Sequence, residues 1–182
     1  MPENRSGTAR ERLLAAALDL FAEHGVSGTS LQMIADRLGV TKAAVYHQFQ
    51  NKDDIVLALI DPALERLGPI ADYADAQRGQ VGRRDATLYG VVDLVVEFRK
   101  VTATLAFDPV VIRLVRAHPT LHSLQRIRRL LGGTAPDPGS RVRMAVLSGG
   151  LMMAGADPAT AGLDNEDLRD HLLAAGRRIL KG

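Results

Sequence analysis

The sequence contains no cysteine and no tryptophan, and aromatic residues make up only 4% of its 182 residues. The absence of cysteine excludes disulfides, thiol nucleophiles and cysteine-ligated zinc or iron–sulfur centres. A long apolar run is also missing, because the longest uncharged stretch covers only 144–156, whereas a membrane helix needs about 20 apolar residues. The first ten residues lack the apolar core of a signal peptide. We therefore expect a cytoplasmic protein that makes no contact with a membrane.

Neither positive nor negative charge predominates over the chain as a whole. Lys and Arg number 23 against 21 Asp and Glu, and the formal net charge of +2 excludes a polybasic tail as the basis of function. The sequence has no G-x-S-x-G, no P-loop, no dinucleotide fingerprint and no H-E-x-x-H. Its five histidines are scattered, and Pro119 separates His118 from His122. We expect neither an enzyme nor a bound metal ion or other cofactor.

What the sequence does contain is helical periodicity. Apolar residues recur at spacings of three and four, and no sustained alternation of period two occurs, which predicts an all-α chain. The expected helices cover 8–24, 29–38, 42–49, 52–67, 83–107, 110–117, 121–131, 141–155 and 166–180. Pro62 should kink or break the fourth of them, and 68–82 is the least periodic segment. We expect a three-helix domain at 1–50 and a larger helical domain at 51–182, joined through the helix that starts near 51.

The first fifty residues carry clear helix-boundary signals. Gly25 should end the first helix, and Thr29 with Gln32 has the spacing of a capping box ahead of a short second helix. Gly39 should end that helix, and Thr41 can cap a third one. Two short helices joined across a single glycine are the arrangement of a helix-turn-helix motif.

Apolar residues of the third helix predict which of its side chains face outward. Val45 and Phe49 can face the core, which leaves on the outer side Thr41, Lys42, Ala43, Tyr46 and His47. Lysine and histidine can reach phosphates or base edges, threonine and alanine can meet a thymine methyl group, and a tyrosine hydroxyl can donate to a phosphate. From Arg37 to Lys52 there are three basic residues and no acidic one. This pattern favours double-stranded DNA as a partner.

The segment that begins with FAEHG and continues as TSLQMIADRLGVTKAAVYHQFQNKDD resembles the DNA-binding domain of the TetR family of transcriptional regulators. The resemblance implies a helix-turn-helix domain followed by an effector-binding and dimerisation domain, and a ligand-responsive repressor that binds a palindromic operator as a homodimer. It implies phosphate contacts from Thr29 or Ser30, Tyr46 and Lys52. It implies contacts at or near base edges from Thr41, Lys42, Ala43 and His47. The alternative is a helix-turn-helix protein that acts only as a protein-interaction adaptor.

In the second domain, polar and aromatic side chains interrupt an apolar run at 88–107. Such groups can line a pocket for a small-molecule effector, or they can be core groups with partners of their own. The candidate ligand-binding residues are Tyr89, Asp93, Phe98, Thr102, Phe107 and Arg113. The interval 109–143 contains seven arginines and a single acid, Asp137. This excess of positive charge indicates either an anionic effector or a solvated face, and the identity of the effector stays open.

The last two expected helices carry narrow apolar stripes. The stripe residues are Met144, Leu147 and Leu151 on the first helix, and Leu168, Leu172 and Ile179 on the second. The first helix is also slim at Ser148, Gly149 and Gly150. A glycine inside a helix costs about 1 kcal/mol relative to alanine, and close packing of a second helix would offset that cost. We expect these residues to form a homodimer interface, and the alternative is that the stripes complete the core of one chain.

Overall fold

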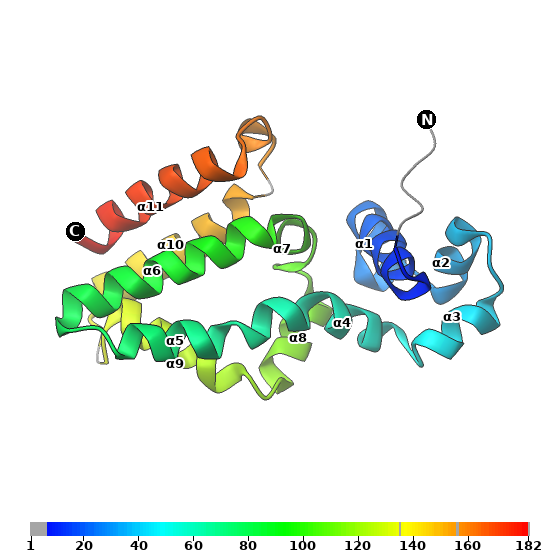
Figure 1. Cartoon of the computed structure of the whole chain (residues 1–182), viewed down its shortest axis with the longest axis horizontal. Helices are drawn as coiled ribbons and strands as arrows, with labels where there is room; N and C mark the ends of the chain where they lie inside the picture. The colour runs from blue at the N-terminus through cyan, green and yellow to red at the C-terminus, as the bar shows by residue number, and fades with distance from the viewer. Residues whose placement is uncertain (1–6, 135, 156, 182) are drawn as a thin grey trace. The chain divides into compact units, whose positions relative to one another are not determined.

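The computed structural model describes residues 7–134, 136–155 and 157–181. Over these residues the chain forms α-helices and one short 3₁₀ turn, without a strand, so the expected all-α class is confirmed. The helices, labelled in Figure 1, are α1 (Ala9–Gly28), α2 (Leu31–Leu38), α3 (Lys42–Gln48), α4 (Lys52–Glu65), α5 (Leu67–Asp75), α6 (Gly79–Glu97), α7 (Arg99–Leu105), α8 (Pro109–Ala117), α9 (Leu121–Gly132), α10 (Pro138–Ala154) and α11 (Asn165–Lys181). None of these helices is long and apolar enough to cross a membrane.

The described chain divides into two compact units. Unit 1 comprises the described residues through Pro62 together with Thr104–Leu114, and unit 2 comprises Ala63–Ala103 and the described residues from Val115 onward. Unit 1 is therefore larger than the expected 1–50 domain, because it includes most of α4 and the corner between α7 and α8. The boundary near residue 50 stays a prediction.

Unit 1 is built on a three-helix arrangement in which α1 packs on α2 and α2 packs on α3. Phe21, Ile34 and Val45 are among its fully buried side chains, one from each helix. Gly25 has a φ of +70°, which splits α1 into a long helix and a final turn at 26–28. Only glycine adopts that φ without a steric cost from Cβ, so the regular part of α1 ends where the sequence predicts.

Two local expectations in unit 1 are corrected. The N-cap of α2 is Ser30, whose hydroxyl accepts the Met33 N–H at 3.1 Å, and the expected cap, Thr29, is buried instead. Pro62 does not break α4, which continues to Glu65, while the alternative expectation of a kink at Pro62 stays a prediction. Its ring lies at an exposed position, where water can bond the carbonyl that loses its helical partner.

Unit 2 is centred on α6, which packs against α5, α9, α10 and α11. Its core contains Leu88 and Val92 from α6, together with apolar residues of the four surrounding helices. Gly176 lets α11 approach α6 closely, because a Cβ at this position would lie only 2.8 Å from Leu88 Cδ1. The apolar periodicity of this half of the sequence thus reflects one continuous core.

The expected helices differ from the observed ones at two places in unit 2. All of α5 except its first residue lies in the segment 68–82, and its buried residues Leu67, Ala71 and Ala74 form too small an apolar stripe to stand out in the sequence. The expected helix 83–107 is two helices, α6 and α7, because Phe98 leaves helical geometry with φ −99° and ψ 23°.

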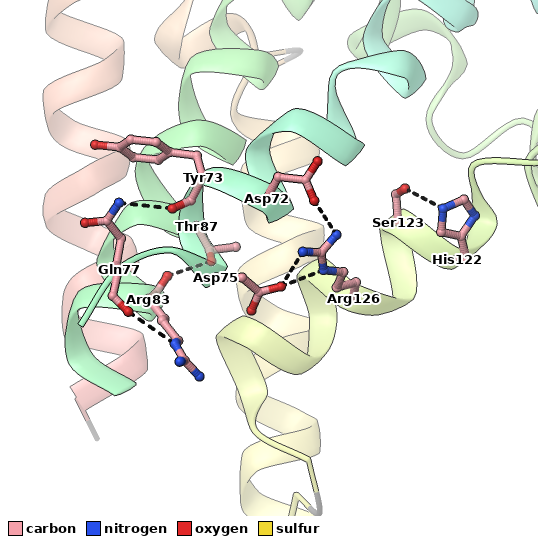
Figure 2. A network of polar contacts seen from close by, with 9 residues as sticks. All are labelled: Asp72, Tyr73, Asp75, Gln77, Arg83, Thr87, His122, Ser123 and Arg126. Atoms are coloured by element: carbon pink, nitrogen blue, oxygen red, sulfur yellow. Dashed lines mark hydrogen bonds and ion pairs between the residues drawn. The ribbon is translucent and has the colours of Figure 1, made fainter. Parts of the chain in front are cut away.

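An arginine clamp joins α9 to α5 (Figure 2). Arg126 donates to Asp75 through Nε at 2.7 Å and to Asp72 through Nη1 at 2.6 Å, and its Nη2 pairs with Asp75 as well. The hydrogen bond to Asp72, with that to Asp75, raises the pKa of Arg126. One of the seven arginines in 109–143 is therefore bound to two carboxylates of its own chain.

Candidate nucleic-acid interface

The orientation of α3 is fixed at both of its ends. Thr41 caps the helix, with its hydroxyl accepting the Ala44 N–H at 3.2 Å. Val45 is fully buried, and Phe49, directly after the helix, is buried and stacked under the guanidinium of Arg10. These contacts hold one side of α3 against the core, so its other side is presented to solvent.

The exposed side of α3 carries Lys42, Ala43, Tyr46 and His47, as the sequence predicts. The ammonium of Lys42 lies 5.6 Å from the centroid of the Tyr46 ring, so the two side chains stand next to each other one helical turn apart. A cation, a phenol and an imidazole on one exposed helical face can donate to phosphates and to base edges.

Ser30 and Thr29 occupy different environments at the start of α2. Ser30 is exposed, and its hydroxyl proton remains available while its oxygen caps the helix. Thr29 is only 2% exposed, and its hydroxyl donates to the carbonyls of Leu20 at 3.1 Å and Gly25 at 2.9 Å. The structure corrects the expectation for Thr29, because a buried and committed hydroxyl cannot contact a phosphate.

Lys52, at the first position of α4, points back to the turn between α1 and α2. Its ammonium donates to the carbonyl of Thr29 at 2.7 Å and to that of Ser27 at 3.2 Å. The expected contact of Lys52 with the DNA backbone is therefore in competition with two hydrogen bonds inside unit 1.

Further polar links hold unit 1 together. Arg37 on α2 donates to both carboxylate oxygens of Glu23 on α1, at 2.8 and 3.2 Å. This hydrogen bond from Arg37 lowers the pKa of Glu23 against the opposing effect of desolvation. Arg113 on α8 donates to Asp53 on α4 at 2.8 Å, and Asp108 accepts the Val26 N–H at 3.1 Å. Asp108 is not among the residues expected to matter from the sequence, although an aspartate directly before a proline is a helix-start signal.

The expected ligand-binding residues are distributed over both compact units. Tyr89 and Asp93 lie on the exposed seam between α6 and α11, where Arg177 stacks on the Tyr89 ring and Arg169 donates to Asp93 at 2.6 Å. Phe98 packs against the core of unit 2. Thr102 is half-buried on α7, where its N–H donates to the carbonyl of Phe98.

The other two expected ligand-binding residues belong to unit 1. Phe107 is 55% exposed, and Arg113 is bound to Asp53. The assignment of these six residues to a ligand-binding site stays a prediction. The apolar run at 88–107, which contains five of the six residues, extends over both compact units.

The expected interface residues lie in the core of their own chain. Leu147, Leu151, Leu168 and Leu172 are buried in unit 2, and two more pack against that core, namely Met144 and Ile179. The four leucines are therefore not an accessible surface, in agreement with the alternative stated for the stripes, whereas Met144 and Ile179 remain partly exposed.

The opposite face of α10 is apolar and exposed, and its residues are not among those expected at an interface. Val142 is 63%, Val146 56% and Met153 49% exposed, and they follow one another at helical spacing. A Cβ at Gly149 or Gly150 would meet no atom within 4 Å, so packing within the chain gives no reason for either glycine. The sequence does contain a pattern that predicts this exposed face, because apolar residues occur on both sides of the helix α10.

Comparisons with known proteins agree with this geometry. Residues 13–59 match the family model of bacterial regulatory proteins, tetR family. The chain is 38% identical over 61 residues to the transcriptional regulator AcrR of Shigella flexneri, covering 34% of this chain and 28% of that protein. It is 27% identical over 105 residues to the transcriptional repressor AcnR of Corynebacterium glutamicum, covering 56% of this chain and 53% of that protein.

Among solved structures, the fold is similar to that of AmtR from Mycobacterium smegmatis. The TM-score is 0.70 at 24% identity, and the alignment covers 100% of this chain and 90% of that one. In sequence, by contrast, the chain spans only 27% of the length of the first curated relatives that it matches. The sequence matches therefore concern chiefly the helices that carry the candidate interface.

Proposed function

This chain belongs to the TetR family through its helix-turn-helix domain, and on that premise we propose that it is a transcriptional regulator that binds double-stranded DNA. The observation that carries the proposal is the exposed side of α3, where Lys42, Tyr46 and His47 stand together above a buried anchor at Val45. A helix of this size fits the major groove of B-form DNA. The matched family is one of regulatory proteins rather than of enzymes.

Within this surface, we assign Tyr46 and Ser30 to phosphates and Lys42 and His47 to base edges. Thr41 and Ala43 lie at the start of α3, where their small exposed side chains permit close approach to the groove. A phenol hydroxyl or a serine hydroxyl donates one hydrogen bond, which suits a phosphate oxygen. Lysine and histidine can discriminate among the acceptors that bases present in the major groove.

We further propose that the protein acts as a homodimer through the exposed face of α10, formed by Val142, Val146, Gly149, Gly150 and Met153. α10 is apolar both on the side that faces its own core and on the exposed side. Burial of the exposed side against a second copy of the chain accounts best for this pattern. The two glycines support the same assignment, since they permit two helices to approach closely. A dimer would present two copies of α3 to a palindromic site with half-sites about 34 Å apart, or a multiple of that distance.

Regulation by a small molecule and repression as the outcome are the finer parts of the proposal. A ligand that binds the free protein more tightly than the DNA-bound protein must release DNA, by no more than that difference in affinity. The name of the relative AcnR supports repression. A thermal-shift screen of metabolites, followed by DNA binding in the presence of each hit, identifies such a ligand or leaves DNA affinity unchanged by every hit.

The experiment that tests the proposed function is selection of binding sites from a pool of random duplexes by the full chain. The proposal expects an enriched sequence with two-fold symmetry. A matched comparison uses Lys42→Ala and, as its control, Lys181→Ala, which removes an exposed lysine from the end of α11. Enrichment of no sequence by the folded wild-type chain would refute the proposal and leave the adaptor role as the better account.

A further inference from the structure

We propose that a groove between the end of α9 and the start of α10 binds a small amphipathic anion, whose charged head lies on two arginines and whose apolar body lies on the rest of the lining. This α9–α10 groove has a volume of about 340 Å³, and its lining includes Arg128, Gly132, Arg141, Met144 and Ala145. Its volume is at the lower end of the range for small-molecule sites. The inference adds a binding site in unit 2 to the proposed function.

Two guanidinium groups, one from each helix, give the groove its positive charge. Among the residues that the structure describes, neither Arg128 nor Arg141 pairs with a carboxylate. Arg141 donates through Nε to the carbonyl of Pro136 at 3.2 Å, which leaves both of its Nη groups available. The nearest acid in the sequence, Asp137, is engaged instead by Ser140, whose N–H and hydroxyl it accepts at 2.9 and 2.7 Å. The groove therefore presents positive charge that no neighbouring acid neutralises.

The two groove arginines differ from other arginines of the basic interval 109–143. Arg113 and Arg126 bind carboxylates of their own chain, and Arg129 is exposed outside the groove. A solvated face accounts for a single exposed arginine such as Arg129. Two arginines from separate helices on one apolar groove favour an anionic ligand, because the guanidinium fork matches a carboxylate or phosphate head.

The rest of the lining is apolar because α9 and α10 approach each other closely. A Cβ at Gly132 would lie only 2.9 Å from Met144 Cγ, so the absence of a side chain lets Met144 lie against α9. The backbone does not require this glycine, since the positive φ that ends α9 belongs to Gly133. Ser148 directs its hydroxyl to the Met144 carbonyl at 2.8 Å and offers a ligand no free proton. The head of the ligand is thus held by the arginines, and its body contacts apolar atoms.

The test titrates octanoate, below its micelle-forming concentration, into full-length protein labelled at the methionine methyl groups. The chain has five methionines, and Met144 is the one among the lining residues. We expect octanoate to shift the Met144 methyl signal, assigned with Met144→Leu, and to leave that of Met33 in unit 1 unchanged. Octanol, which lacks the charge, should bind at least about fivefold more weakly. Acetate should cause no shift, because it has almost no apolar surface to bury.

Three variants separate the charge of the groove from its apolar lining. Arg128→Gln with Arg141→Gln should weaken octanoate binding by at least about fivefold and leave octanol binding unchanged. The matched control, Arg129→Gln with Arg178→Gln, removes two exposed arginines that do not line the groove and should bind octanoate as the wild type does. Ala145→Phe keeps both charges but fills the groove, so it should lose both octanoate and octanol. Circular dichroism checks that each variant is folded.

Three results would overturn the inference. The first is an unshifted Met144 signal at the highest octanoate concentration, and the second is equal affinity of the charge variant and its control for octanoate. The third is a monomer for Arg128→Gln with Arg141→Gln where the control variant stays a dimer in sedimentation, which would assign the groove to a second copy of the chain. None of these measurements uses DNA, so failure of the wild-type chain to select any duplex would refute the proposed function alone.

Discussion

The carboxylate of Asp108 accepts the backbone N–H of Val26 at 3.1 Å, although the two residues are 82 positions apart in the sequence. The other oxygen of the same carboxylate accepts the Val110 N–H at 2.8 Å, at the start of α8. One side chain thus satisfies the first turn of α8 and the residue that follows the kink at Gly25. This contact explains in part why the corner between α7 and α8 belongs to the same compact unit as the helix-turn-helix.

Replacing Asp108 should destabilise unit 1. Asp108→Ala leaves the buried Val26 N–H without its acceptor, and we expect the free energy of unfolding to fall by about 1–3 kcal/mol. Asp108→Asn keeps one acceptor oxygen and should cost less. Urea denaturation followed by circular dichroism measures both, with Asp170→Ala on the exposed side of α11 as the control. Equal stability of Asp108→Ala and the control would contradict this assignment.

The pair of Glu23 and Arg37 should contribute to stability only above acidic pH. The pKa of Glu23 is lower in the folded chain than in the unfolded chain, because Arg37 donates to its carboxylate. The contribution is therefore complete above the ordinary carboxyl pKa and is lost as the pH falls through the lowered value. Wild type should be more stable than Glu23→Gln at neutral pH, and the difference should shrink toward pH 3.

Urea denaturation over a series of pH values measures that difference, and Glu65→Gln on the exposed end of α4 is the control. A difference between wild type and Glu23→Gln that stays constant from neutral pH to pH 3 would mean that the ion pair does not contribute in this way.

An acidic residue on the exposed face of α10 should dissociate the proposed dimer. Val146→Asp places a charge in an interface that excludes water, while in the isolated chain residue 146 is exposed and the fold should be unaffected. Val81→Asp is the matched control, because Val81 is 75% exposed elsewhere in unit 2. Sedimentation at micromolar concentration should give a dimer for wild type and control and a monomer for Val146→Asp. A wild-type monomer would remove the basis for the dimer.

Substitution of a residue that contacts phosphates should change DNA binding in a different way from substitution of a residue that contacts base edges. Tyr46→Phe should weaken binding to all duplexes alike, since it removes one donor to the backbone. His47→Ala should change the preferred base at one symmetric pair of positions, and the binding free energy should weaken by about 1–3 kcal/mol for each base pair no longer read. Repeating the site selection with each variant measures the two effects. An unchanged preferred sequence for His47→Ala would move His47 to the phosphate contacts.

The sequence is most informative where each helix boundary has its own local signal. Gly39, with φ +65°, ends α2, and Thr41 caps α3, both as expected from residue type alone. Asp108, Asp137 and Asp157 each precede a proline and each accept a backbone N–H at a helix start. The Asp-Pro dipeptide therefore predicts the first residues of α8 and α10 more accurately than the spacing of apolar residues does.

Tertiary contacts are what the sequence could not reveal. Apolar spacing identifies two apolar faces on α10, but it does not indicate which of them packs against the core of unit 2. In the structure Leu147 is buried in that core and Val146 is exposed. The hydrogen bonds of Lys52 have no sequence signal either, since their acceptors are backbone carbonyls, which every residue has. The link between Arg113 and Asp53 spans 60 positions and has no local signature.

The most direct test of the central claim measures the affinity of the selected duplex for a double variant on the exposed face of α3. Lys42→Ala with Tyr46→Ala should reduce that affinity by at least about a hundredfold, since the change removes one charged and one polar hydrogen-bond donor from each subunit. The control pair is Lys181→Ala with Tyr73→Ala, which removes an exposed lysine and an exposed tyrosine from unit 2. We predict wild-type affinity for the control and unchanged folding in both double variants. Equal affinity of the two double variants for the selected duplex would contradict the claim that α3 is the DNA-binding surface.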